Sequence, residues 1–177
     1  MSNQKFTVTF CLLIMMSGFV FYGCENKTNC DPFSVSAIDE FSAVEKEGFS
    51  PFYIHRGVNA LAVNSEMFEN DYAIAEYKFQ QKKGEYNIKI TTVLEVDGES
   101  TYLLFINNKQ VAQLVNEETE VDLVEKTYDF GKFKLHQDDV IGIAFNNISN
   151  EKIIENEGQF AFARGRWKNL IFERVCN

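Results

Sequence analysis

The stretch from Gly84 to Asn108 restricts the fold of this chain more than any other part of the sequence. Its side chains alternate with period two, and one face carries Ile88, Ile90, Thr92, Leu94 and Val96. Alternation with β-branched residues is typical of a half-buried strand. Asp97-Gly98 tolerates the positive φ angles of a tight turn, and a second apolar strand follows over residues 102–106. We therefore predict a β-hairpin at the centre of a layered core.

Most of the remaining chain also predicts short strands. Strand patterns separated by polar turns cover residues 61–64, 72–80, 110–115, 121–124, 128–135, 140–145 and 159–176. One short helix is expected over Val35–Glu47, where apolar residues recur at three-residue spacing between Ser36, a candidate N-cap, and Gly48. About eight strands with little helix favour an all-β fold, an antiparallel β-sandwich.

The first 23 residues have the layout of a secretory signal. A short start with one cation, Lys5, precedes an apolar run over residues 6–22, and Gly23 is a small residue directly before Cys24. Such a layout is typical of export signals. An uncleaved membrane anchor is an alternative, since a run of about 17 residues is at the lower limit for spanning a bilayer. An ordinary secreted protein is another.

Gly23-Cys24 resembles the lipobox of bacterial lipoproteins, in which the signal is cut before a cysteine that then receives lipid. Phe21 and Tyr22 depart from the leucine and the small residue that are usual there. The resemblance implies that residues 1–23 are a lipoprotein signal peptide, that Cys24 is lipidated and that residues 24–30 are a tether. The protein would be an outer-membrane lipoprotein on the periplasmic or surface side of the cell envelope. It would contact the membrane through this lipid anchor, and residues 31–177 would form the folded domain.

The folded part of the chain is acidic. The chain carries 17 lysines and arginines against 26 acidic residues; removal of residues 1–23 takes away only Lys5, which leaves 16 cations and a net charge of −10. Nucleic-acid binding needs basic patches that neutralise phosphates. We therefore expect no nucleic-acid partner, and no adhesion of the domain itself to an anionic bilayer.

Two of the four cysteines are predicted to pair. Cys11 lies in the signal and Cys24 is the lipid acceptor, which leaves Cys30 and Cys176 at the two ends of the domain. Export places both in an oxidising compartment. We predict a Cys30–Cys176 disulfide, with two free thiols as the alternative.

Three motifs lie in the part of the chain that is rich in strands. They are E-x-D-G-E-S-x-Y over Glu95–Tyr102, L-H-Q-D-D-V-I over Leu135–Ile141, and F-A-R-G-R-W over Phe162–Trp167. Together they resemble galactose-binding-domain-like jelly rolls, the fold of many noncatalytic carbohydrate-binding modules, except that Asp138 stands where those modules have glycine. The resemblance covers residues 60–175. It implies a jelly-roll sandwich that binds carbohydrate without altering it, although one fold hosts many functions.

The expected ligand site lies around the only tryptophan. The apolar faces of sugar rings stack on aromatic rings, and arginine pairs with carboxylates or with paired hydroxyls. The candidate carbohydrate-binding residues are therefore Trp167, Arg164, Arg166 and Asn146. The structural alternative places Trp167 in the core and pairs Arg164 with Glu95 or Asp97.

Two other functions are alternatives. The same sandwich suits a protein-interaction or assembly subunit of the cell envelope. The E-x-D-x-E pattern of Glu95, Asp97 and Glu99 also resembles the core of retaining β-glucanases, with Glu95 as nucleophile and Glu99 as acid/base if both lie on one strand face. Gly98 argues for a turn at that point, so we expect no enzyme and no catalytic residue.

No cofactor is expected from the motifs. The sequence has no G-x-S-x-G, no H-E-x-x-H and no phosphate loop. His55 and His136 lack the spacing of metal ligands, so no metal site is assigned. A structural calcium is the one ion that such jelly rolls suggest, with Asp138-Asp139 or Asp97 and Glu99 as candidates, and solvated acidic turns explain these residues equally well.

Overall fold

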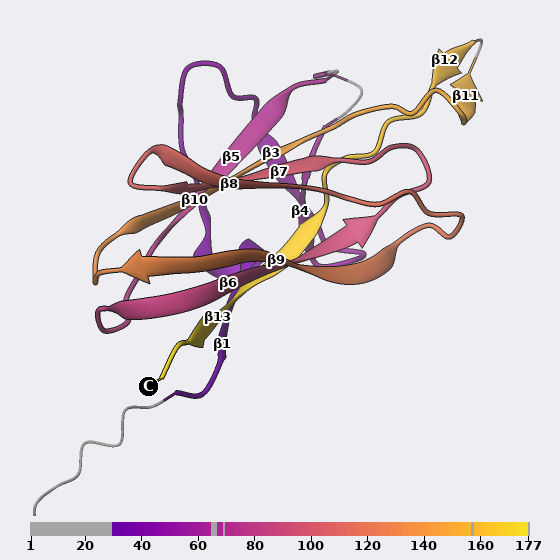
Figure 1. The fold of residues 1–177 in the computed structure, drawn as a ribbon. Helices are drawn as coiled ribbons and strands as arrows, with labels where there is room; N and C mark the ends of the chain where they lie inside the picture. The colour runs from indigo at the N-terminus through magenta and orange to yellow at the C-terminus, as the bar shows by residue number, and fades with distance from the viewer. Residues whose placement is uncertain (1–29, 65–66, 69, 157, 177) are drawn as a thin grey trace, which may run out of the picture.

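The computed structural model describes residues 30–64, 67–68, 70–156 and 158–176 of the chain (Figure 1). The expected signal peptide and the lipidation site Cys24 lie outside these residues. Within the described ranges, no helix has the length and apolar character needed to cross a membrane.

Two antiparallel sheets form a sandwich. One sheet has the order β3-β4-β13-β6-β9, with β1 also paired to β13. Its strands are β1 (Phe33–Ser36), β3 (Phe52–His55), β4 (Ala60–Val63), β6 (Gly84–Leu94), β9 (Val124–Leu135) and β13 (Trp167–Arg174). The other has the order β2-β5-β10-β7-β8. Its strands are β2 (Ser42–Ala43), β5 (Tyr72–Lys78), β7 (Thr101–Ile106), β8 (Lys109–Val115) and β10 (Val140–Asn146). The predicted all-β antiparallel sandwich is confirmed.

A third, two-stranded sheet projects from the body of the sandwich. It pairs β11 (Ile154–Asn156) with β12 (Gln159–Phe160), and Figure 1 shows it standing clear of the two large sheets. It lies inside the segment that precedes β13 in the sequence.

The predicted central hairpin is wrong in its pairing. β6 pairs with β13 and β9, whereas β7 pairs with β10 and β8 in the other sheet. The turn at Asp97-Gly98 therefore carries the chain from one sheet to the other. A Cβ on Gly98 would lie 2.3 Å from the carbonyl oxygen of Ile148, so only glycine permits this close approach of two loops.

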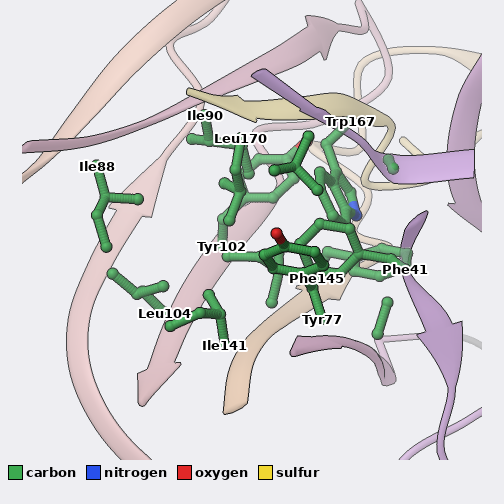
Figure 2. Close-up of a cluster of buried hydrophobic side chains, with 14 of the residues drawn as sticks. Phe41, Tyr77, Ile88, Ile90, Tyr102, Leu104, Ile141, Phe145, Trp167 and Leu170 are labelled. Atoms are coloured by element: carbon green, nitrogen blue, oxygen red, sulfur yellow. The ribbon is translucent and has the colours of Figure 1, made fainter. Parts of the chain in front are cut away.

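The predicted faces of the two strands are correct even though their pairing is not. Ile88 and Ile90 of β6 and Tyr102 and Leu104 of β7 are all buried, and they meet in the layer between the sheets (Figure 2). Trp167 lies in the same layer. Its indole meets Phe41 edge-on at 4.9 Å between ring centroids.

The short helix predicted within Val35–Glu47 is present but has only one turn, α1 (Ala37–Glu40). β1 before it pairs with β13, and β2 after it pairs with β5. Pairing into both sheets satisfies the backbone groups that a longer helix would have bonded internally. Phe41 then enters the core against Tyr77 and Trp167.

The predicted disulfide is confirmed. Cys30 and Cys176 are bonded, with 6.2 Å between their Cα atoms. The bond joins the chain just before β1 to the chain just after β13, two strands that are paired. It therefore closes a loop that contains every strand of the sandwich.

Replacing both bonded cysteines by serine should destabilise the fold. The two residues are separated by 146 positions, and restricting an unfolded loop of this length contributes about 5 kcal/mol as an upper estimate. We expect the Cys30→Ser/Cys176→Ser variant to lose about 2–5 kcal/mol in its free energy of unfolding, measured by urea denaturation. A reducing agent should lower the stability of the wild type and leave the variant unchanged. Equal stability of the two proteins would contradict the prediction.

Candidate functional site

A cleft of about 470 Å³ opens beside the edge strand β3. Three aromatic residues and one arginine are among its lining residues. The ring of Phe52 packs toward Phe145 of the core, at 5.9 Å between ring centroids. The lining residues come from β3, from the segment after β4 and from the corner before β13: Pro51, Phe52, Tyr53, Asn64, Met67, Phe68 and Arg164. Segments distant in the sequence therefore meet at one opening.

The corner Arg164-Gly165-Arg166 brings Arg164 to the cleft. Gly165 has a φ of +60°, and a Cβ there would lie 2.4 Å from the carbonyl oxygen of Asn146. Both the positive φ and the close approach to Asn146 require glycine at this position. The corner carbonyls are also held, because Val63 N–H donates to Arg164 O and Val93 N–H donates to Arg166 O, each at 2.9 Å.

The carboxylate of Glu95 anchors the corner from the inside. Glu95 is only 3% exposed and forms an ion pair with Nη1 of Arg166. The backbone N–H of Arg164 donates to both carboxylate oxygens, at 3.1 and 3.0 Å. Burial raises the pKa of Glu95 to about 7, while Arg166 and the backbone donors act in the opposite direction. We assign Glu95 a structural role.

Each arginine of the corner also binds one side chain of β3. Nη1 of Arg164 donates to the hydroxyl of Tyr53 at 3.3 Å, and Nε of Arg166 donates to Nδ1 of His55 at 2.9 Å. Tyr53 and His55 are two residues apart, so they share one face of the strand. The two hydrogen bonds tie the edge strand to the corner and hold the Tyr53 ring at the cleft.

Three of the four predicted ligand residues are wrong. Trp167 is 0% exposed and belongs to the core; Arg166 is 7% exposed and bonded to Glu95 and His55; Asn146 is 6% exposed and accepts the N–H of Thr101 at 2.7 Å. None of these side chains has a free surface to offer a ligand. Arg164 alone reaches the cleft, and its role in binding stays a prediction.

Sequence reasoning missed the aromatic residues of the cleft. Phe52 and Tyr53 lie in a segment whose only signal is its density of aromatic residues from Phe49 to Tyr53. Phe68 lies in a segment without any periodic pattern. Edge strand β3, which brings Phe52 and Tyr53 to the opening, was not predicted.

The residues of the glycosidase alternative are not arranged as that alternative requires. β6 ends at Leu94, and Glu95 bridges to Gly98 within a turn, so Glu95, Asp97 and Glu99 do not share a strand face. Glu95 is occupied inside the protein, and Glu99 accepts a hydrogen bond from Asn150 Nδ2 at 3.2 Å. Retaining hydrolysis needs two carboxyl groups that reach one substrate.

The candidate calcium ligands serve as turn residues. Asp139 accepts hydrogen bonds from the His136 N–H at 2.7 Å and from Asn107 Nδ2 at 2.9 Å, and Asp138 pairs with Lys78. In the part of the chain that the structure describes, no group of three or more His, Cys, Asp or Glu residues is placed to hold a metal ion.

Comparison with known proteins gives one relative in sequence and several in fold. No protein-family model matches the chain. An uncharacterised protein of Formosa agariphila is 29% identical over 127 residues, which cover 70% of this chain and 28% of that protein. The chain thus spans less than a third of the relative that it matches.

Among solved structures, an insecticidal crystal protein, Cry2Aa, matches with a TM-score of 0.50 and 16% identity over 81% of this chain and 21% of its own. This likeness concerns the β-sandwich fold alone. A CBM35 of Paenibacillus barcinonensis matches with a TM-score of 0.47 and 12% identity, over 81% of this chain and 99% of its own. The C-terminal CBM6 of LamC, a marine laminarinase of Zobellia galactanivorans, matches with a TM-score of 0.47 and 11% identity, over 81% and 100%.

Replacing Glu95 by alanine should destabilise the protein strongly. The change leaves the buried Arg166 guanidinium and the Arg164 N–H without their acceptor, and breaking one side of a buried pair costs about 3–5 kcal/mol. Urea denaturation measures this loss in the free energy of unfolding. As a control, Glu125→Ala removes the partner of Lys168 at an exposed pair and should change stability little. If both variants behave alike, Glu95 is not the anchor described here.

The stability that depends on His55 should vary with pH. Burial lowers the pKa of His55 from its usual value of 6.5, and the charges of Arg166 and Arg164 lower it further. The unfolded chain therefore binds a proton at this residue at a higher pH than the folded chain. The contribution to stability is present above the unfolded pKa and is lost as the pH falls below about 6.5.

We expect the difference in free energy of unfolding between wild type and His55→Gln to shrink or reverse from about pH 7 to about pH 5. Glutamine keeps an acceptor for Arg166 at every pH. The contribution of Glu95 has the opposite sign, because its raised pKa favours the folded state at low pH, but it is present in both proteins and cancels. A difference that does not change with pH would contradict the prediction.

Proposed function

We propose that this chain is a noncatalytic carbohydrate-binding protein of the cell envelope and that its ligand site is the cleft beside β3. The observation that carries the proposal is the combination of the aromatic residues Tyr53 and Phe68 with the Arg164 guanidinium at a single opening. Aromatic rings bind the apolar faces of sugars, and a guanidinium binds their oxygen atoms. Small-ligand sites typically enclose about 300–1,000 Å³, so the cleft is large enough for a short saccharide segment.

The position of the cleft is consistent with a lipid anchor at Cys24. The corner that carries Arg164 precedes β13, and the bonded Cys176 follows it. An eight-residue strand is roughly 25 Å long, so the cleft and the disulfide lie at opposite ends of it. In Figure 1 the carboxyl terminus lies at the lower left and β3 on the upper side of the sandwich. A chain tethered through residues before Cys30 would therefore hold its cleft away from the bilayer.

A second candidate function is protein interaction or assembly, and one observation favours it. The projecting β11–β12 sheet exposes Ile154, at 67%, and Phe160, which pair across the two strands. Exposed apolar side chains gathered on one surface are typical of protein interfaces.

Tyr53→Ala and Phe68→Ala should each weaken saccharide binding by about tenfold, because each removes one aromatic wall of the cleft. The measurement is isothermal titration of the purified protein with a panel of neutral and acidic oligosaccharides, after thermal unfolding has shown that each variant is folded. Phe160→Ala is the matched control: it removes an aromatic ring from the projecting sheet and should leave saccharide affinity unchanged. If the folded wild type binds no oligosaccharide of the panel, the proposal is rejected. Capture of a partner protein by the wild type and not by Phe160→Ala would support the second candidate.

A further inference from the structure

The two arginines of the corner differ in their bonded partners. Glu95 is the carboxylate that bonds to the corner among the described residues, and its side-chain partner is Arg166. His55 adds no charge while it accepts a hydrogen bond at Nδ1 from Arg166, because this nitrogen must then be unprotonated. Asp97 and Glu155 act on the arginines through their charge, without a hydrogen bond to either side chain.

The guanidinium of Arg164 has no bonded carboxylate among the described residues. Glu95 is occupied by the Arg166 guanidinium and by backbone N–H groups. Among the residues that the structure describes, no carboxylate forms an ion pair with Arg164; its guanidinium donates to the neutral hydroxyl of Tyr53. Glu95 and Glu155 act on Arg164 only through their charge and without a hydrogen bond to its side chain.

The Arg164 side chain has unused donors at the cleft. A guanidinium carries five N–H groups in a fixed fork, and the Tyr53 hydroxyl takes one of them. Arg164 is half-buried, so an anion that met it in the cleft would interact in a medium of lower dielectric constant than water. Two parallel N–H groups bind the oxygens of a carboxylate or a sulfate more strongly than they bind neutral hydroxyls.

The Arg164 guanidinium is a local cation in a chain with a net charge of −9. Charges more than about 8 Å apart are largely screened at physiological ionic strength. An anionic group that bonds directly to Arg164 is therefore little affected by the distant acidic residues of the chain.

We propose that the cleft selects an anionic saccharide and that Arg164 determines this specificity by binding the carboxylate or the sulfate ester of a sugar. This inference rests on the proposed function and goes beyond it by naming the class of ligand. A uronic acid and a sulfated sugar present the same oxyanion chemistry to the guanidinium, so the experiment separates the two sources.

The test titrates the purified protein with three oligosaccharides of similar length: a neutral glucan, an oligouronate and a sulfated galactan. We expect the oligouronate, the sulfated oligomer or both to bind at least about tenfold tighter than the neutral one. Arg164→Gln should abolish the preference for the anionic ligand. Arg164→Lys keeps the positive charge but lacks the paired N–H groups of the guanidinium, so it should retain part of the preference for the anionic ligand. Lys132→Gln, an exposed site on β9, makes the same change in net charge and should leave the preference intact.

The outcomes separate this inference from the proposed function. Neutral and anionic oligomers bound equally tightly, or a preference that survives in Arg164→Gln, would overturn anion selection and leave carbohydrate binding in place. Absence of binding to all three oligomers by folded protein would overturn the proposed function and this inference with it. If Arg164→Gln does not fold, the preference of the wild type and its partial loss in Arg164→Lys decide the question.

Discussion

The ion pair between Glu95 and Arg166 is the interaction on which this end of the sandwich depends. Both side chains are buried, and a charge without a partner in the protein interior would be very costly. Each side chain therefore requires the other. The same carboxylate receives backbone N–H groups of the corner, and the Arg166 carbonyl accepts the hydroxyl of Tyr102 from the opposite sheet at 2.9 Å. A polar network of this kind holds both sheets and the edge strand β3 together, and removal of one member leaves several partners unsatisfied.

The sequence alone identified the fold class, the buried faces of the principal strands and the disulfide. The buried faces can be predicted from neighbouring residues alone. Period-two alternation indicates which side of a strand faces the core, as at Ile88, Ile90 and Leu104. The cysteine pairing followed from the small number of candidates. Which strand lies beside which is not encoded in this way. The turn chemistry of Asp97-Gly98 suits a hairpin as well as a crossing between sheets, and in the observed crossing Gly98 lies against the backbone carbonyl of the distant Ile148.

The candidate site was harder to predict because its members are distant in the sequence. Whether Arg166 faces water or the interior depends on Glu95, 71 positions earlier in the sequence. The residues around Arg166 do not indicate that Glu95 is its partner. Trp167 follows Arg166 into the core as the first residue of β13. Conversely, Tyr53 and Phe68 become neighbours only when β3 and β4 pair and the corner closes over them.

Gly165 explains how two arginines of one short motif come to have different roles. Its left-handed backbone turns the chain sharply against Asn146, so that Arg166 enters the interior while Arg164 stays at the opening. Arg166 takes up the Glu95 carboxylate, and among the described residues no carboxylate bonds to the Arg164 guanidinium. A single arginine here would serve either the fold or a ligand, since a guanidinium held by a buried carboxylate is no longer available to an anion from outside. With two arginines on either side of a glycine, one neutralises Glu95 and the other keeps its charge at the cleft.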